Sequence, residues 1–381
     1  MTQVHQPKSE ADIAEIVRAG QTLEIKGGGT RSGLGPAIDA DAVLSTQSLS
    51  GVTSYDPGAL NIVVAAGTPV DTVVSTLAAE GQYLPFEPVD HRFLLGSSGA
   101  PSIGAIVAGN ISGSRRILTG ACRDSLIGVR FVNGVGEAIS NGGRVMKNVT
   151  GYDLVKLLCG SWGTLGVLTE VSFKVLPKPE RATTLQIDGL DISQAVQAMA
   201  AALSSPFEVS GAAHEPGPDS RTYIRVEGFD AQVDYRIGKL KTLIGGDEAL
   251  IEGDAHCDLW CKIRNAKAFA GDDRSVWRIS VPPSEAPRFV EAIGAKTNAN
   301  MLLDWGGGLI WASLDAHLGA APIQSAIDQA GGHATLTRGN ESLRGSVNIL
   351  RPDGPRIAAL EDALRRKFDP NGILNPGRMA A

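Results

Sequence analysis

The first half of the chain is a series of short apolar runs separated by glycine. Residues 9–18 place apolar side chains at helical spacing between Ser9, a good N-cap, and Gly20, so we expect a short amphipathic helix. Residues 68–81 predict a second helix that ends in glycine. The Asn133-Gly134 dipeptide predicts the turn of a hairpin. Other short apolar stretches predict strands over 23–26, 43–45, 62–66 and 164–175.

The pattern changes after Pro177 and Pro179, which mark the clearest boundary in the chain. Beyond them strand and helix signals alternate in the order β-α-β-β-α, and this order occurs twice, over 184–243 and over 277–330. Two such units predict an α+β domain in which helices cover one face of an antiparallel sheet. A last short helix is expected from Ile357, ahead of the segment FDPNGILNPGRM.

Composition narrows the class of protein. The length of 381 residues predicts two to three domains, and 43% hydrophobic with 20% charged residues is ordinary for a globular chain. A net charge of −6 without a long run of Lys or Arg argues against nucleic-acid binding. The N-terminus has acidic residues and no apolar core, so we expect no signal peptide and a cytoplasmic protein. The uncharged stretch 93–114 is too rich in Gly and Ser to predict a membrane span.

Cysteine usage predicts neither a disulfide framework nor an iron–sulfur cluster held by this chain alone, because the four cysteines are few and scattered. Cys257 and Cys261 lie near His256, which leaves a metal site as one interpretation. Two ordinary thiols on one helix face are the better interpretation, so we expect no bound metal.

Glycine is the compositional outlier, at 46 of 381 residues. The loop Gly27–Gly35, which reads GGGTRSGLG, follows a predicted strand, and successive backbone N–H groups in such a loop can bind phosphate oxygens. The loop has neither the spacing of a Walker A motif nor that of a Rossmann fingerprint. A plain glycine turn between strands is the alternative interpretation.

A second glycine- and serine-rich loop spans 96–113. Its side chains are too small to form a core of their own, so we expect it to wrap a ligand at backbone distance. Two such loops about 70 residues apart favour a diphosphate with a long body between them. A dinucleotide cofactor fits this arrangement best.

Three motifs carry a resemblance to a known family: KGGGT at 26–30, MKNVTGYDL at 146–154 and GSWGTLGVLTE at 160–170. Together they resemble the FAD-linked oxidases of the para-cresol methylhydroxylase/vanillyl-alcohol oxidase type. The closing FDPNGILNPGR at 368–378 is similar to the C-terminal signature of the lactate and glycolate branch. Within that branch, the runs WRIS, LDWGG and GGHAT resemble the FAD-binding subunits of bacterial glycolate oxidases, which are also called glycolate dehydrogenases.

The resemblance implies an α+β fold with three parts. A two-subdomain FAD-binding domain would cover 1–178, a smaller antiparallel-sheet α+β cap domain 179–345, and a C-terminal segment, 346–381, would return to the first domain. The implied cofactor is FAD. We expect it to be bound non-covalently, because neither glycine-rich loop contains a histidine and no motif of the covalent members is matched.

The family pattern also implies FAD-binding residues. It assigns one side of the pyrophosphate to Gly27, Gly28, Gly29, Thr30 and Arg31, and the other side to Ser102, Ile103 and Gly104. It assigns the ribityl chain and isoalloxazine to Gly109, Asn110 and Gly113, and the adenine half to Gly166 and Val167. Ala105 departs from the family's second glycine at this place, and its methyl group is expected to loosen flavin binding.

The catalytic residues stay unknown at this level. The D-2-hydroxyacid dehydrogenases of this branch that act as one polypeptide carry a Glu-His-Gly-x-Gly run that this sequence lacks. His333 is a weak candidate for a catalytic base, with a structural or interface role as the alternative. Lys147 is a weak candidate for the cation that favours reduced flavin. We expect His91, His214 and the arginine pair after the second loop at the surface.

By resemblance, the chain is one flavin subunit of a glycolate oxidase complex that oxidises glycolate, a small 2-hydroxy acid, to glyoxylate. The missing run suggests that a paralogous flavin subunit holds the main substrate site, while this chain serves electron transfer or assembly. The expected partners are that subunit and an iron–sulfur subunit, through which the complex could attach peripherally to the inner membrane. Two alternatives stay open: a self-sufficient FAD-dependent 2-hydroxyacid dehydrogenase, and a flavin-free scaffold subunit.

Overall fold

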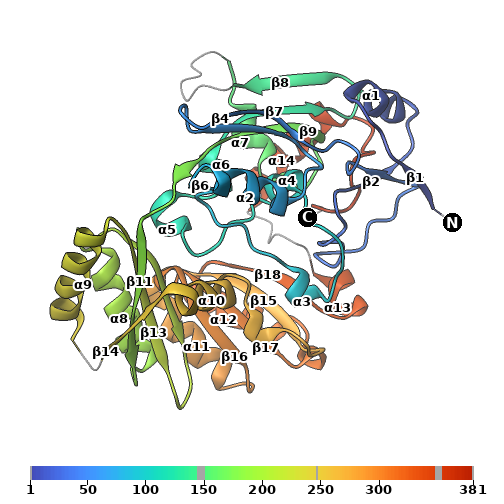
Figure 1. The fold of residues 1–381 in the computed structure, drawn as a ribbon. Coiled ribbons are helices and arrows are strands. Elements are labelled where there is room, and N and C mark those ends of the chain that lie inside the picture. Colours follow the sequence, from blue (N-terminus) through green and yellow to red (C-terminus); the bar gives the residue numbers. More distant parts are fainter. Residues whose placement is uncertain (1, 144–150, 246–247, 348–353, 380–381) are drawn as a thin grey trace.

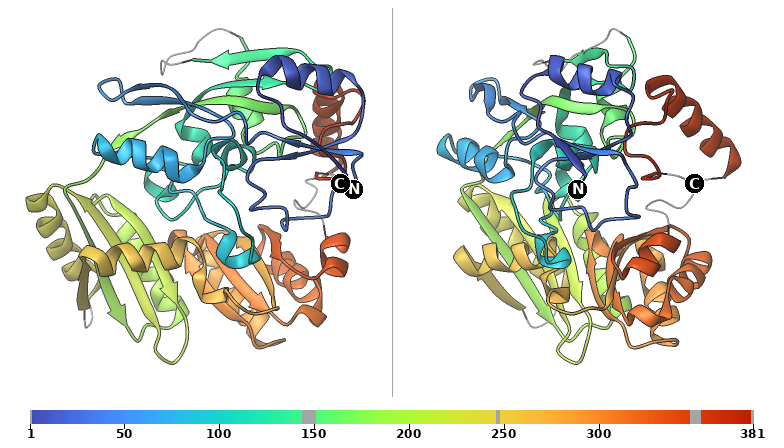
Figure 2. Two further views of the ribbon diagram at one scale, coloured as in Figure 1. Left: turned by 45° about the vertical axis from the view of Figure 1, so that its right-hand side comes forward. Right: turned by 90° about the vertical axis from the view of Figure 1, so that its right-hand side faces the viewer.

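The computed structural model describes residues 2–143, 151–245, 248–347 and 354–379. Figure 1 shows the first part of the chain, in blue to green, stacked on a second part in yellow to orange. Figure 2 shows the C-terminal helix α14 (Pro355–Phe368), in red, beside the first part of the chain. The polypeptide therefore returns to the elements with which it began.

The first part contains three sheets and two buried apolar clusters. A five-stranded antiparallel sheet has the order β4-β5-β9-β7-β8, a parallel three-stranded sheet the order β1-β3-β2, and β10 pairs with β6. The strands are β1 (Gln3–His5), β2 (Leu23–Lys26), β3 (Ala42–Ser45), β4 (Val52–Asp56), β5 (Asn61–Ala65), β6 (Gln82–Tyr83), β7 (Leu126–Val132), β8 (Ala138–Gly142), β9 (Val167–Lys174) and β10 (Leu176–Pro177). The helices are α1 (Glu10–Arg18), α2 (Val70–Ala79), α3 (Arg92–Leu95), α4 (Ile103–Ala108), α5 (Arg116–Thr119), α6 (Cys122–Ser125) and α7 (Leu154–Leu158).

Local signals in this part of the sequence correspond to the observed elements. Helix α1 begins with a capping box, in which the Ser9 hydroxyl accepts from the Asp12 amide and the Asp12 carboxylate accepts from the Ser9 amide. Strands β7 and β8 form the predicted hairpin, with Val132 paired to Ala138 across the turn. These short-range predictions are confirmed.

The prediction that 96–113 forms only a loop without core contacts is wrong. Residues 103–108 form helix α4, and the side chains of Ile103, Ile106 and Val107 are buried in the main cluster beneath the five-stranded sheet. Three apolar side chains in six residues are enough to fix one helical turn and a half against a core, even between glycine-rich flanks.

The second part is built on an eight-stranded antiparallel sheet of order β14-β11-β13-β12-β16-β17-β15-β18. Its strands are β11 (Arg181–Asp188), β12 (Val209–Glu215), β13 (Arg221–Gly228), β14 (Glu248–Glu252), β15 (Ser275–Ser280), β16 (Asn300–Asp304), β17 (Leu309–Leu314) and β18 (His333–Arg338). Its helices are α8 (Ile192–Leu203), α9 (Asp230–Ile244), α10 (Gly253–Arg264), α11 (Ala286–Gly294), α12 (Ala321–Ala330) and α13 (Glu341–Ser346).

The strand order shows that this sheet consists of two copies of one unit, which pair along one edge. Each copy runs β-α-β-β-α-β, and the order β14-β11-β13-β12 is the mirror of β16-β17-β15-β18. A single bridge from His214 to Leu303 joins the two copies. The predicted α+β class with an antiparallel sheet is confirmed, and each unit ends in an additional edge strand.

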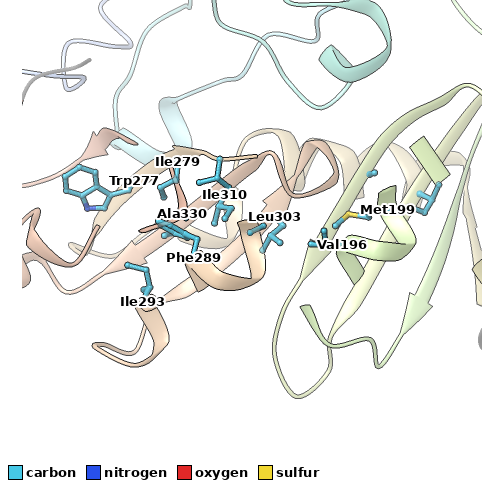
Figure 3. Close-up of a cluster of buried hydrophobic side chains, with 14 of the residues drawn as sticks. Val196, Met199, Trp277, Ile279, Phe289, Ile293, Leu303, Ile310 and Ala330 are labelled. Atoms are coloured by element: carbon cyan, nitrogen blue, oxygen red, sulfur yellow. The ribbon is translucent and has the colours of Figure 1, made fainter. Parts of the chain in front are cut away.

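Helices α8, α11 and α12 cover one face of this sheet and enclose its core. Figure 3 shows Phe289 of α11 and Ala330 of α12 beside Ile279 and Ile310 of the sheet, and Met199 of α8 farther along the same cluster, beyond Leu303. All of these side chains are at most 5% exposed. Burial of each large apolar side chain contributes about 1.5–3 kcal/mol, so this cluster holds the sheet and its helices together.

The opposite face of the sheet is covered as well, which corrects the expectation of helices on one face only. Side chains alternate along a strand, so Tyr223 and Trp311 point away from the core that their neighbours Ile224 and Ile310 enter. Trp260 of α10 packs on this second face, together with Leu94 of the first part of the chain. The first part of the chain therefore packs on this face of the eight-stranded sheet, which is called the platform sheet below.

A buried group of charges fixes the two parts to each other. Glu87 accepts from Arg225 of β13 at 2.9 Å and lies 3.5 Å from Arg115, which also pairs with Glu227. Burial alone would raise the pKa of Glu87, but Arg225, Arg115 and Arg264 outweigh it and hold that pKa far below the ordinary value. Arg115 is buried at 9% exposure, so its expected place at the surface is wrong. The ionised network positions the platform sheet against the first part of the chain.

Candidate functional site

A cavity of about 790 Å³, the open solvent at its mouth included, lies in the first part of the chain. The cavity is enclosed by β2, the loop that follows it, α4, the turn before β9 and the C-terminal segment. Its lining consists of Glu24, Ile25, Lys26, Gly27, Gly28, Gly29, Thr30, Arg31, Ser32, Thr46, Ala66, Gly104, Ala105, Ala108, Trp162, Gly163, Gly166, Leu168, Asn375 and Arg378.

The loop after β2 presents a run of free backbone donors to this cavity. The amides of the five successive residues 27–31 have no hydrogen-bond acceptor among the described residues, whereas the next amide, that of Ser32, donates to Gly29. All five residues line the cavity. Successive free N–H groups form a concavity that attracts anions.

The second loop packs directly against the first, and the glycines make this approach possible. A Cβ atom on Gly28 would lie 1.6 Å from the Ala100 carbonyl oxygen, and one on Gly27 would lie 1.9 Å from the Ser102 Oγ. Gly29 instead requires glycine for its left-handed backbone, with φ +72°. The three glycines therefore serve two different needs, close approach and positive φ.

The N-terminus of α4 is less available to a ligand than the first loop. The amide of Ile103 donates to Thr68, and that of Gly104 donates to Ala66, so both are used within the fold. Ser102 is 1% exposed, and its Oγ has no partner among the described residues. Of this loop, Gly104, Ala105 and Ala108 line the cavity, while the side chain of Ile103 lies in the core.

Arg31 is a buried cation at the edge of the cavity. Its guanidinium donates to the Val89 carbonyl at 3.0 Å and to Nδ1 of His91 at 3.3 Å, while its Nη1 is buried without a partner in the described ranges. His91 is itself 5% exposed, so the prediction of a surface histidine is wrong. Burial, with the nearby charges of Arg31 and Arg278, lowers the pKa of His91 to about 3, so its imidazole is neutral at pH 7.

The C-terminal segment closes one wall of the cavity with residues that were not predicted. The Asn375 amide group donates to the Trp162 carbonyl at 2.8 Å and accepts from the Ile25 amide at 2.7 Å. Arg378 packs near the Trp162 ring, and its buried Nε finds no partner in the part of the chain that the structure describes. Both residues belong to the NPGR run that carried part of the resemblance, and this run was the signal that could have identified them.

The remaining predicted FAD residues divide between the cavity and its surroundings. Gly166 lines the cavity, whereas Val167 is buried in the core at the start of β9. Gly109, Asn110 and Gly113 do not line it. Asn110 has a left-handed backbone, with φ 49°, and its side chain accepts from the Arg123 amide.

The two candidates for catalysis lie apart from this cavity or outside the described residues. His333 is exposed at the start of β18, an edge strand of the platform sheet. Lys147 lies outside the described residues. His214, expected at the surface, is fully buried in β12, where its Nδ1 pairs with the Thr222 hydroxyl at 2.9 Å.

The described ranges contain neither a candidate metal site nor a candidate membrane span. They contain no group of three or more His, Cys, Asp or Glu side chains arranged to hold a metal ion. Cys257 and Cys261 both lie on α10, and Cys261 accepts a hydrogen bond from Asn265. No helix in those ranges is long and apolar enough to span a bilayer.

Comparison with known proteins relates this geometry to one family. Residues 1–142, which include the first loop and α4, match the family described as FAD binding domain. Glycolate oxidase subunit GlcE of Escherichia coli (strain K12) is 33% identical over 360 residues, which cover 94% of this chain and 93% of that protein. Glycolate oxidase subunit GlcD of Bacillus subtilis (strain 168) is 32% identical over 143 residues, 38% of this chain and 29% of that protein.

Solved structures agree on the fold. The 4-ethylphenol oxidase from Gulosibacter chungangensis superposes with a TM-score of 0.73 at 15% identity and covers 98% of this chain and 88% of its own. This likeness shows the architecture alone, whereas the 33% identity over nearly the whole length shows the family. The chain is therefore an FAD-linked oxidoreductase that belongs to the family of glycolate oxidase subunit GlcE.

Proposed function

We propose that this chain is the FAD-binding subunit of a glycolate oxidase complex, and that it serves electron transfer or assembly rather than the main oxidation of glycolate. The observation that carries the proposal is the run of five free amides at residues 27–31, all of which line the cavity. A ligand with a diphosphate satisfies such a run, because its oxygens accept from several N–H groups at once.

The residues of the cavity fit FAD. The amides of 27–31 would hold the pyrophosphate, with the partnerless Nη1 of Arg31 supplying positive charge beside it. Gly166, Asn375 and Arg378 would enclose the adenine half from the other wall. When bound, FAD supplies the electron acceptor for oxidation of the substrate. The protein's own part is to orient the cofactor by backbone contacts and to exclude water around it.

The described lining of the cavity contains no group suited to remove the hydroxyl proton of a hydroxy acid. None of the chain's six histidines lines it. The one lining carboxylate, Glu24, is paired with Lys26 at 2.8 Å. A general base must lie within hydrogen-bond reach of the substrate proton, and the Glu-His-Gly-x-Gly run of the related dehydrogenases is missing from this sequence; this supports a role in which the paralogous flavin subunit performs the main oxidation.

The partners follow from the same proposal. The relative from Escherichia coli is named as a subunit, and a related subunit, GlcD, matches part of this chain. We therefore propose a complex with that paralogous flavin subunit and an iron–sulfur subunit as the electron outlet. Attachment to the inner membrane would then be peripheral, through the partners.

Activity of the isolated chain tests this division of labour. We expect negligible glycolate-dependent dye reduction by the purified chain, while dithionite still reduces its flavin. In the reconstituted complex, His333→Ala should lower turnover less than about tenfold, since loss of a true base typically costs 10²–10⁴. Rapid glycolate oxidation by the isolated chain that His333→Ala abolishes would instead identify a self-sufficient dehydrogenase.

A further inference from the structure

A second hollow lies in the part of the chain that contains the platform sheet. Its volume is about 1000 Å³, the open solvent at its mouth included, and it shares no lining residue with the cavity beside residues 27–31. Its walls come from the N-terminus of α8, the end of β12, the turn after β12 and α11. Since α8 belongs to the first copy of the repeated unit and α11 to the second, the hollow lies where the two copies meet.

The charged side chains in the wall of this hollow are all negative. They are the carboxylates of Asp191, which precedes α8, and Glu291, in α11, and the lining contains no Lys or Arg. Neither carboxylate forms an ion pair with a described residue, and Arg288, on the same helix as Glu291, pairs with Glu285 instead. One oxygen of Asp191 accepts from the Gln194 amide at 2.8 Å and so caps α8. Two carboxylates alone would be an ordinary solvated surface.

The observation that points to a ligand is a buried histidine in the same wall. His214 lines the hollow at 0% exposure, and its Nε2 has no hydrogen-bond partner among the described residues. Its other ring nitrogen, Nδ1, pairs with the Thr222 hydroxyl at 2.9 Å. A buried polar atom without a partner is costly, so native folds rarely keep one unless a ligand or water completes it.

The imidazole of His214 is neutral and can accept a hydrogen bond from a ligand. Burial is the largest influence and lowers its pKa to about 4, although the Arg221 backbone and the charge of Asp191 act in the opposite direction. At pH 7 the ring therefore carries one proton and one lone pair. A ligand with N–H donors selects the tautomer in which Nδ1 donates to the Thr222 hydroxyl and Nε2 presents its lone pair.

The ligand that fits these three groups is an organic cation rather than a metal ion. A metal ion needs ligands that converge on one point, and the described ranges contain no such group of His, Cys, Asp and Glu side chains. A guanidinium spreads five N–H donors over a plane, so it can reach two carboxylates and an imidazole that do not converge. Pro216, Pro218 and Pro287 add apolar wall against which the hydrocarbon stem of such a cation can pack.

We propose that this hollow binds an alkylguanidinium group, with Asp191 and Glu291 as its counter-ions and His214 as a buried acceptor. The site is independent of the proposed function, because it shares no residue with the cavity assigned to FAD. Two sources present this chemistry, a free guanidino compound and an arginine side chain of another protein.

Calorimetric titration of the full chain with n-butylguanidinium chloride tests the proposal. One molecule should bind per chain, whereas n-butylurea, the neutral isostere, should not bind. Asp191→Asn keeps a good helix cap, and this variant and Glu291→Gln should each raise the Kd about threefold, and together about tenfold. Asp230→Asn, which removes an equal charge at the start of α9 outside the hollow, should leave it unchanged. Equal binding of butylurea, equal effects of all three single variants, or abolition by equimolar sodium chloride would overturn the proposal.

The ring nitrogens of His214 supply a second readout. In protein labelled with ¹⁵N-histidine, the signal that disappears in His214→Gln assigns this residue. Butylguanidinium should shift its Nε2 resonance and leave that of the exposed His333 in place. An unchanged His214 signal at saturation would overturn the proposal, and the two carboxylate variants keep it testable if His214→Gln does not fold. Nα-acetyl-arginine methylamide distinguishes the sources: binding as tight as that of butylguanidinium supports a protein side chain, and weaker binding supports a free compound.

Discussion

Replacement of Gly28 tests whether the contact between the two glycine-rich loops builds the cofactor site. Gly28 does not have a positive φ, so alanine is acceptable to its backbone. The obstacle is contact, because the new Cβ atom would lie 1.6 Å from the Ala100 carbonyl oxygen and 2.7 Å from its carbon. Real Cβ atoms essentially never approach closer than 3.0 Å, so the loops must separate by at least about 1.4 Å.

The cost of this separation follows from the rigidity of both loops. The backbone amides of Ile103 and Gly104, which follow Ala100 closely, donate hydrogen bonds to the carbonyls of Thr68 and Ala66. Ala100 therefore cannot move without breaking these bonds. Overpacking of this kind costs about 1–3 kcal/mol. Gly28→Ala should lose a similar amount of FAD affinity, at least about tenfold or roughly 1.4 kcal/mol, and Gly28→Val should lose more.

The assay is the dissociation constant for FAD, measured by fluorescence titration of the apoprotein, alongside the thermal midpoint. Gly294→Ala is the matched control, because a Cβ atom there meets nothing within 4 Å and the backbone is not left-handed. We expect the control to bind FAD like the wild type. Undiminished FAD affinity in a folded Gly28→Val variant would refute the reasoning and leave the loop as a turn.

Two further predictions concern the contact between the two parts of the chain. Glu87→Gln removes one of the two buried carboxylates that pair with Arg115 and Arg225 and should destabilise the protein by about 3–5 kcal/mol in urea unfolding, whereas Glu208→Gln, at an exposed pair, should cost less than about 1 kcal/mol; equal losses would contradict the network. Burial raises the pKa of Asp304 to about 6 from 3.8, so the folded state keeps a proton that the unfolded chain has lost, and wild-type stability should fall as pH rises between these values. Asp304→Asn should remove up to about 3 kcal/mol of that fall, and parallel curves for the two proteins would show that the carboxyl does not titrate there.

The short-range features of this fold could be predicted, whereas its edge strands and the contact between its two parts could not. The capping box at Ser9 and the repeated strand order depend on neighbouring residues, and both are present. Strands β14 and β18 escaped prediction because edge strands are partly exposed and lack a clear apolar alternation. Helix α4 escaped because its glycine-rich flanks concealed three core side chains.

Within the candidate site, what could be predicted was the part carried by the backbone. The anion-binding character of the first loop could be predicted from its glycines alone, because free backbone amides need no partner elsewhere in the sequence. His91, Asn375 and Arg378 depend on partners far along the chain: Asn375 bonds to Ile25, 350 residues away. Such pairings arise only from the tertiary fold.

The central claim is that the cavity beside residues 27–31 holds FAD without a covalent bond. The most direct measurement is the absorption spectrum of the purified full-length chain before and after acid precipitation. We predict a flavin band near 450 nm that passes entirely into the supernatant, because neither glycine-rich loop contains a histidine and no motif of the covalent members is matched. A colourless protein, or a yellow pellet, would contradict the account.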